Sequence, residues 1–271
     1  MAEKTLLSPR IDLAVKAARL YAFAERLEQR MRFRPSLSCV LAVFAIAGGP
    51  AAAGDAKAVV ELFTSQGCSS CPRADKLLGE FANDERLIAL SLAVDYWDYL
   101  GWRDTLALHA HTSRQKGYAT HRGDRHVYTP QVVINGALET IGSDRYAIDR
   151  IVGKIDSTSN LSVPVSLTRN GANVDIEVGA GSGSASIWVL PVTKQAPVTI
   201  ERGENRGKTI TYHNVVRGWT RVGDWRGAPV RLSLAIADMA QSGADMAAVL
   251  VQSGTVEAPG PIRGGALITL R

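Results

Sequence analysis

Cysteine is scarce in this sequence. Its 271 residues contain three, and one of them, Cys39, lies in an N-terminal segment that we expect to be removed. The mature chain then keeps only Cys68 and Cys71. In an oxidising compartment a lone pair at this spacing is either a structural staple or a working redox couple. Because a four-residue bridge closes a very short loop, the chain-entropy model assigns it little stability, which favours the redox couple.

A charge excess is missing from the part of the chain that we expect to fold. The net charge is +5, but residues 1–53 hold eight basic and four acidic residues, which leaves 23 basic against 22 acidic residues in the remainder. The high isoelectric point of about 9.2 therefore belongs to the N-terminal segment. We expect no nucleic-acid partner.

Long hydrophobic runs are lacking as well. The apolar stretch 37–47 is too short to cross a bilayer as an ordinary helix, so we expect no stable membrane anchor. It follows two arginines and precedes small residues that end at Ala53, which is the charged, apolar and small order of a secretory signal peptide. We expect residues 1–56 to be an extension and signal peptide, with Met31 as the true start and cleavage near Ala53. The alternative is an uncleaved helical extension over residues 1–47.

The cysteine pair lies between an apolar run and a helical pattern. Ala58–Phe63 is β-branched and aromatic enough to predict a buried strand, and apolar residues recur at helical spacing over 74–81. Pro72 suits the first turn of that helix. A helix N-terminus stabilises a thiolate, so the junction predicts Cys68 as the nucleophile and Cys71 as the resolving cysteine.

Further strands and helices alternate after this junction. Residues 86–94 predict a second buried strand, 105–118 a helix, and Asn135-Gly136 a tight hairpin that is followed by a helix over 143–155. This order predicts an α/β core with an antiparallel edge. An aromatic-rich segment at 95–104 forms either internal packing or the wall of a groove beside the cysteines.

These motifs resemble known families. Residues 58–156 resemble a thioredoxin-fold domain, which implies that Thr129-Pro130 is a cis-proline peptide against the sulfurs and that Glu61 is a buried acid beneath them. From the residues alone, Glu61 fits a solvent-facing edge position equally well. More narrowly, residues 94–102, 128–131, 203–207 and 212–217 are similar to motifs of a secreted bacterial thioredoxin-like family catalogued as domain of unknown function 1223. The Ser-Ser dipeptide between the cysteines departs from well-studied thioredoxins, so the direction of electron flow stays open.

The remainder of the chain changes character. Residues 161–271 contain about seven short β-rich runs separated by turn residues, with a second hairpin signal at Asn170-Gly171. We therefore expect an α/β thioredoxin-like domain over 57–156 and an all-β, sandwich-like domain over 161–271, joined by a linker at 156–160. The second segment shows no catalytic constellation.

Four histidines occur close together in the sequence, at 109, 111, 121 and 126. No glutamate or cysteine completes a recognisable zinc spacing, so we interpret them as solvated side chains and predict neither a metal nor another cofactor. A copper site of cysteine and histidine is the alternative.

These observations predict a periplasmic or secreted thiol-disulfide oxidoreductase. Its partners would be protein thiols or disulfides, and its site residues would be Cys68, Cys71, Thr129, Pro130 and Glu61. The alternative is a non-catalytic binding, assembly or metal-handling protein with the same fold, in which the disulfide is structural.

Overall fold

The computed structural model describes residues 56–155, 161–240 and 243–271. The predicted signal peptide, its cleavage site and the linker at 156–160 lie outside these residues. No described helix combines the length and the apolar character that crossing a membrane requires. The first half of the described chain contains β1 (Ala58–Thr64), α2 (Pro72–Phe81), β2 (Leu87–Ala93), the 3₁₀ turn η1 (Asp98–Leu100), α3 (His109–Arg122), β3 (Gln131–Ile134), β4 (Leu138–Ile141) and α4 (Arg145–Ile155).

Local sequence signals account for most of these elements. Every residue of β1 and β2 is buried, as their apolar runs predict. The hairpin between β3 and β4 is confirmed, with Asn135 and Gly136 at φ of 51° and 67°. The helix α3 starts four residues later than predicted because Leu108 is still extended. The helix α4 is capped by Asp144, whose carboxylate accepts from the Ala147 N–H at 2.9 Å.

The second half of the described chain is almost entirely strand. Its elements are β5 (Val165–Asn170), β6 (Asn173–Val178), β7 (Ala185–Thr199), β8 (Thr209–Val216), β9 (Thr220–Trp225), β10 (Val230–Ala235), α5 (Ile236–Met239), β11 (Met246–Gly254) and β12 (Pro259–Thr269). The sequence did not predict β9. The strand β7 extends well beyond the β-rich run that the sequence predicts over 186–190. The β5–β6 hairpin at Gly171 is confirmed, because Asn170 pairs with Asn173.

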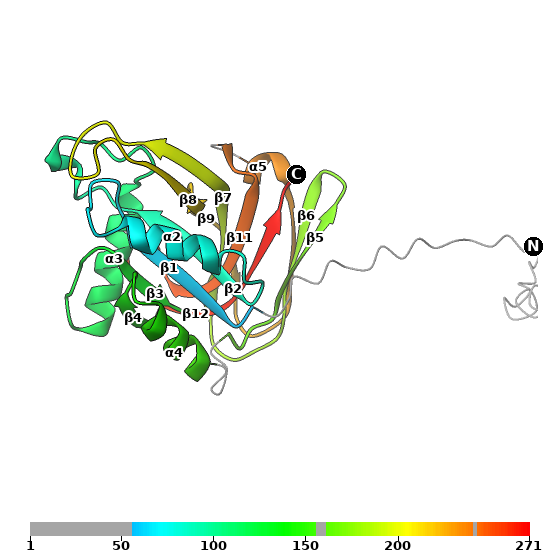
Figure 1. The fold of residues 1–271 in the computed structure, drawn as a ribbon. Helices are drawn as coiled ribbons and strands as arrows, with labels where there is room; N and C mark the ends of the chain where they lie inside the picture. The colour runs from blue at the N-terminus through cyan, green and yellow to red at the C-terminus, as the bar shows by residue number, and fades with distance from the viewer. Residues whose placement is uncertain (1–55, 156–160, 241–242) are drawn as a thin grey trace, which may run out of the picture. The chain divides into compact units, whose positions relative to one another are not determined.

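The predicted fold class, an α/β thioredoxin-like domain followed by an all-β sandwich-like domain, is wrong. Strands from both segments form one mixed nine-stranded sheet in the order β12-β11-β7-β8-β2-β1-β3-β4, with β9 paired to β7 (Figure 1). Two of its strand pairs, β1 with β2 and β2 with β8, are parallel. The described chain is therefore mostly β, and helices are a minor part of it.

The join between the two halves lies at β2 and β8. Ser91 pairs with Val215, and the Asn214 side chain donates to the Ala89 carbonyl at 2.9 Å. One buried apolar cluster spans the join, with Phe63 and Leu90 from the first half and Leu250 from the second. Burial on both sides of this join explains why β2 is not a sheet edge.

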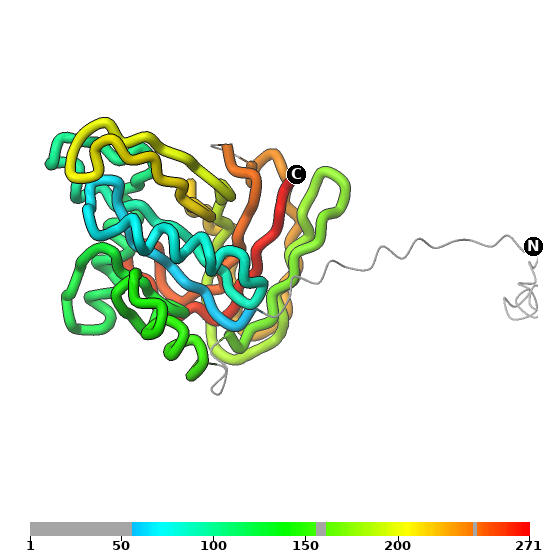
Figure 2. The backbone as a smooth tube through the Cα atoms, in the orientation of Figure 1, coloured from blue at the N-terminus to red at the C-terminus, as the bar shows by residue number. Residues whose placement is uncertain are grey.

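A second, three-stranded sheet has the order β10-β6-β5. Its apolar face packs against residues of β7, β11 and β12 in a separate buried cluster that includes Ile176, Val249 and Trp225. The tube view shows the β5–β6 hairpin beside the C-terminal strand (Figure 2). This layer lies away from the cysteine pair and positions none of its residues.

Candidate functional site

The cysteine pair lies in the turn between β1 and α2. Cys68 and Cys71 form a disulfide. The Cys68 N–H donates to the Ser65 carbonyl at 3.1 Å, and the Cys71 N–H donates to the Cys68 carbonyl at 3.2 Å. Cys71 is the N-cap residue of α2. Cys68 and Cys71 are 1% and 0% exposed, so in this oxidised state the sulfurs are covered.

A buried acid lies in the first turn of α2, just after the pair. Asp75 follows Cys71 by four residues, so the two side chains share one face of α2. One Asp75 carboxyl oxygen accepts from the Thr64 hydroxyl at 2.7 Å, and the other has no hydrogen-bond partner among the described residues. Burial raises the pKa of Asp75 to about 8. The carboxyl is therefore mostly protonated at neutral pH.

Two more ionisable groups line the same interior region. Asp104 accepts from the Gln66 N–H at 2.7 Å, and burial raises its pKa. The Tyr212 hydroxyl on β8 has no partner among the described residues, and burial, together with the carboxyls of Asp75 and Asp104, raises its pKa. The nearby charge of Asp104 disfavours ionisation of Asp75 and so raises its pKa further, as a smaller effect than burial.

The Thr129-Pro130 peptide is cis and lies near the start of α2. A methyl group added at Gly142 would lie 3.1 Å from the Pro130 side chain and 3.4 Å from that of Ala74, which makes these two side chains neighbours. The Trp97 indole N–H donates to the Thr129 hydroxyl at 2.8 Å.

Trp97 also contacts the turn that carries the cysteines, residues 65–71, which we call the cysteine turn. A methyl group added at Gly67 would lie 3.0 Å from Trp97 Cβ. The Trp97 ring stacks on Tyr99, which is 78% exposed. The aromatic segment thus joins the cysteine turn to the loop at 123–130 that carries Pro130, which we call the proline loop. It also presents one aromatic side chain to solvent.

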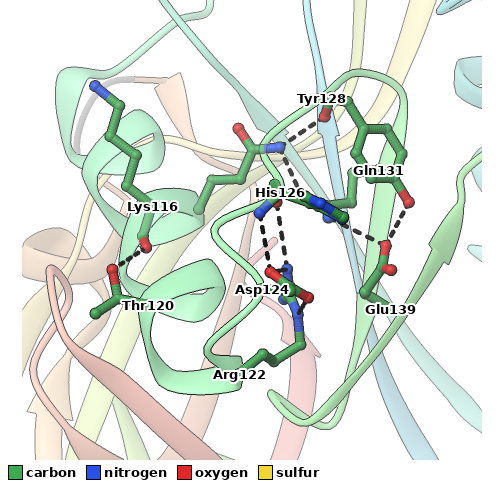
Figure 3. Close-up of polar contacts among 9 residues, drawn as sticks. Lys116, Thr120, Arg122, Asp124, His126, Tyr128, Gln131 and Glu139 are labelled. Atoms are coloured by element: carbon green, nitrogen blue, oxygen red, sulfur yellow. Dashed lines mark hydrogen bonds and ion pairs between the residues drawn. The ribbon is translucent and has the colours of Figure 1, made fainter.

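A polar network holds the proline loop from the other side (Figure 3). The buried Gln115 amide on α3 donates to the Tyr128 carbonyl at 2.7 Å and to the Gln131 side chain at 2.8 Å. Gln131 in turn donates to Glu139 at 3.1 Å, and the Tyr128 hydroxyl donates to the same carboxylate. These bonds tie the loop to α3 and β4.

Residues from the second half of the chain close the site. The turn between β7 and β8 lies beside the loop that precedes α2 (Figure 1). The Asn205 side chain donates to the carbonyls of Gln66 and Cys68 at 2.9 and 2.8 Å, and Glu204 accepts from the Ser69 N–H at 3.2 Å. Neither residue is among the predicted site residues, although both lie in the family-like motif at 203–207.

The structure does not bring Glu61 to the sulfurs. Its carboxylate accepts from the Arg114 guanidinium at 2.9 Å and from the Tyr118 hydroxyl at 2.6 Å, and all three side chains are buried. Glu61 lies in the cluster packed under α3, whereas Thr64, on the opposite face of β1, contacts Asp75. The buried acid that shares α2 with the pair is Asp75, four residues after Cys71. A carboxylic acid in the first turn of the helix, four residues after the second cysteine, was the available signal.

The histidines do not gather in one place. His109 pairs with Asp95 on the surface, while His111 is buried and bonds the Ala93 carbonyl at 3.0 Å. Burial lowers the pKa of His111 to about 4. The described residues contain no group of three or more histidine, cysteine or acidic side chains placed to hold a metal ion.

Comparisons with known proteins show similarity to solved structures and to one family model. A crystal structure of an Agrobacterium tumefaciens protein is 36% identical, with a TM-score of 0.73, and the match covers 80% of this chain and 96% of that one. HBP35 of Porphyromonas gingivalis is similar in fold alone, at 12% identity and a TM-score of 0.51, over 78% of this chain and 74% of that one. No curated protein matches. The model of the family described as protein of unknown function, DUF1223, matches residues 59–252, and the chain belongs to that family.

Proposed function

We propose that this protein is a periplasmic or secreted thiol-disulfide oxidoreductase that acts on other proteins through Cys68 and Cys71. The observation that carries the proposal is the disulfide at the start of α2 with the buried acid Asp75 behind it. A disulfide with a proton donor beside one sulfur can exchange with a partner thiol. The cis peptide before Pro130 lies near Ala74 at the start of α2, which supports this proposal.

Exchange with a partner dithiol takes two successive attacks. A partner thiolate attacks the Cys68 sulfur, the Cys68–Cys71 bond breaks, and Cys71 leaves as a thiolate that takes the proton of Asp75. A second partner thiolate then attacks the partner sulfur of the mixed disulfide and releases Cys68 as a thiolate, which takes a proton from water. The partner loses two electrons and gains a disulfide, and the pair becomes a dithiol. Run in reverse, the reaction reduces a partner disulfide.

Access to the pair requires movement, because Cys68 is 1% exposed in the oxidised state. Ser69 and Ser70 are exposed, so the peptide between the cysteines is the part that a partner meets first. Tyr99 is also exposed, and it stacks on Trp97, whose Cβ lies beside Gly67. Aromatic side chains of this kind are favoured at protein interfaces.

Trapping in the native host tests the activity. In a Cys39→Ser background, Cys71→Ser should accumulate mixed disulfides with other proteins, and Cys68→Ser should accumulate none. A reduction potential between about −120 and −270 mV would fit exchange catalysts. Asp75→Asn should slow release of Cys71 at least about tenfold at pH 7.

Mass spectrometry of the mature N-terminus from the same cells tests export and cleavage near Ala53.

A second candidate function is favoured by the burial of both cysteines. In that case the protein binds or assembles partners and the disulfide is structural. A reduction potential below about −300 mV, with no mixed disulfide in the Cys71→Ser variant, would select this candidate over the first.

A further inference from the structure

The turn at residues 203–207 is built to stay in place. Gly203 and Gly207 have φ of 77° and 80°, a conformation that favours glycine, and the Gly207 N–H donates to the Ile200 carbonyl at 2.7 Å. Lys208 donates to the Asn205 side chain at 2.9 Å, which leaves the Asn205 amide N–H groups pointed at the cysteine turn. Asn205 is fully buried, although it lies in an otherwise exposed turn.

Asn205 thereby fixes the position of its neighbour. Its two hydrogen bonds hold the turn on the Gln66 and Cys68 carbonyls, and Glu204 then reaches the Ser69 N–H at 3.2 Å. Ser69 directly follows Cys68, so its N–H belongs to the peptide beside the nucleophilic sulfur. The 203–207 turn therefore places a carboxylate against this peptide.

We propose that Glu204 tunes the cysteine pair toward electron donation, so that its substrates are protein disulfides that it reduces. This inference rests on the proposed function. The Glu204 carboxylate occupies a backbone N–H that would otherwise stabilise a Cys68 thiolate, and it adds a negative charge nearby. A less stable thiolate makes the dithiol form less stable, and a pair with a less stable dithiol is the stronger reductant.

Other groups facing Cys68 act with or against Glu204. The buried Asp75 lies one helical turn after Cys71, Asp104 accepts from the Gln66 N–H two residues before Cys68, and the Lys208 ammonium donates to Asn205. The Ser70 hydroxyl lies 3.4 Å from the Cys68 sulfur and is the contact that can stabilise a thiolate. Glu204 is the exposed acid of this set, so its charge can be removed without opening the core.

The reduction is balanced by a second protein. Cys68 attacks the substrate disulfide, Cys71 resolves the mixed disulfide, and two electrons pass to the substrate, which leaves as a dithiol. A dithiol protein must then return two electrons to the Cys68–Cys71 disulfide. In the test below, glutathione takes the place of that donor.

The experiment measures the equilibrium of the pair with glutathione. In the Cys39→Ser background, Glu204→Gln should shift this equilibrium toward reduced protein about tenfold, which corresponds to a potential about 30 mV higher. Thiolate absorbance in the Cys39→Ser, Cys71→Ser background should show the Cys68 titration midpoint moving to lower pH. Ser70→Ala should shift both readouts in the opposite direction.

Glu201→Gln is the matched control, because Glu201 is exposed near the same turn and no contact with the cysteine turn is found. A Glu204→Gln shift of at least threefold that Glu201→Gln lacks supports the inference. A smaller shift, or an equal one in the control, overturns it. If Glu204→Gln shifts the glutathione equilibrium but Cys71→Ser traps no partner, Glu204 tunes the pair and the proposed oxidoreductase activity is contradicted. If partners are trapped but the equilibrium does not shift, the oxidoreductase activity is supported and the role of Glu204 is contradicted.

Discussion

At the scale of single residues, two buried acids in the first half of the chain have opposite environments. Glu61 meets a guanidinium and a phenol, so its charge is compensated inside the core. Asp75 meets one hydroxyl, and its second oxygen has no partner among the described residues. A compensated acid suits a structural role, and an uncompensated one suits proton exchange.

The pH dependence of stability tests the state of Asp75. Its folded pKa of about 8 lies above the ordinary aspartate value of 3.8, so between these values the folded protein keeps a proton that the unfolded chain has lost. This contribution lowers stability as pH rises through the range, with a slope of up to about 1.4 kcal/mol per pH unit. Asp75→Asn removes it, so the variant should gain on the wild type between pH 5 and pH 8 in urea unfolding of the oxidised protein.

Parallel stability profiles for the two proteins would contradict a raised pKa for Asp75. His111, whose pKa burial lowers to about 4, titrates in both proteins and cancels in the comparison. Keeping the disulfide intact removes cysteine titration from both profiles.

The Glu61 ion pair predicts a different outcome. Glu61→Gln leaves the buried Arg114 guanidinium without its counter-charge and should destabilise the fold by about 3–5 kcal/mol. The glutathione equilibrium of the folded fraction should stay the same, because Glu61 does not contact the pair. Urea unfolding measures the loss, with the exposed Glu85→Gln as the control. A loss no larger than that of the control would show that the pair is not needed for stability.

At the scale of elements, the proline loop is ordered by side chains from its neighbours. The segment 123–130 before β3 pairs with no strand. Its contacts come instead from Gln115 on α3, Trp97 near η1 and Glu139 on β4. The position of Thr129 and Pro130 thus depends on side chains from elements on both sides of it in the sequence.

Gln115→Ala tests this dependence. It leaves the Tyr128 carbonyl and the Gln131 side chain without their donor, which should destabilise the fold by about 1–3 kcal/mol. Amide hydrogen exchange over 123–130 should quicken more than exchange in α2. Thr120→Ala, a helix-surface change on the same α3, serves as the comparison. Uniform exchange rates across the two variants would show that the network does not order the loop.

At the scale of the whole molecule, the second half of the chain completes the site that the first half begins. The β7–β8 turn supplies Glu204 and Asn205, and β8 supplies Tyr212. The β2–β8 pairing places these groups, because β8 runs next to the strand that neighbours β1. The family motifs at 203–207 and 212–217 therefore belong to the site and to the join that positions it.

Asn214 tests the join. It has a φ of 48°, and its side chain bonds the Ala89 carbonyl at 2.9 Å. Asn214→Gly removes the hydrogen bond, and glycine adopts the positive φ without strain. We expect it to lower the free energy of unfolding by about 1 kcal/mol. Asn214→Ala also places a Cβ in the left-handed region, and a loss of about 2 kcal/mol is expected. Urea unfolding distinguishes the two, and equal losses would contradict a role for the positive φ.

Much of the local structure follows from the residues. The buried runs of β1 and β2, the hairpins at Asn135-Gly136 and Asn170-Gly171 and the start of α2 at Pro72 all occur as predicted. These features depend on neighbours in sequence, namely turn chemistry and apolar periodicity. The β9 strand was missed because its sequence, with two charged residues and a glycine, carries a weak strand pattern.

The sequence by itself determined the family, the position of the cysteine pair and most strands and helices, because those features depend on motifs and on residues close together in the chain. The tertiary structure alone decided that both halves share one sheet, that Asp75 is the acid behind the pair, and that Glu204 lies on the peptide beside Cys68. Strand partners and burial depend on contacts between residues far apart in the chain, and apolar periodicity identifies a strand without identifying its neighbour.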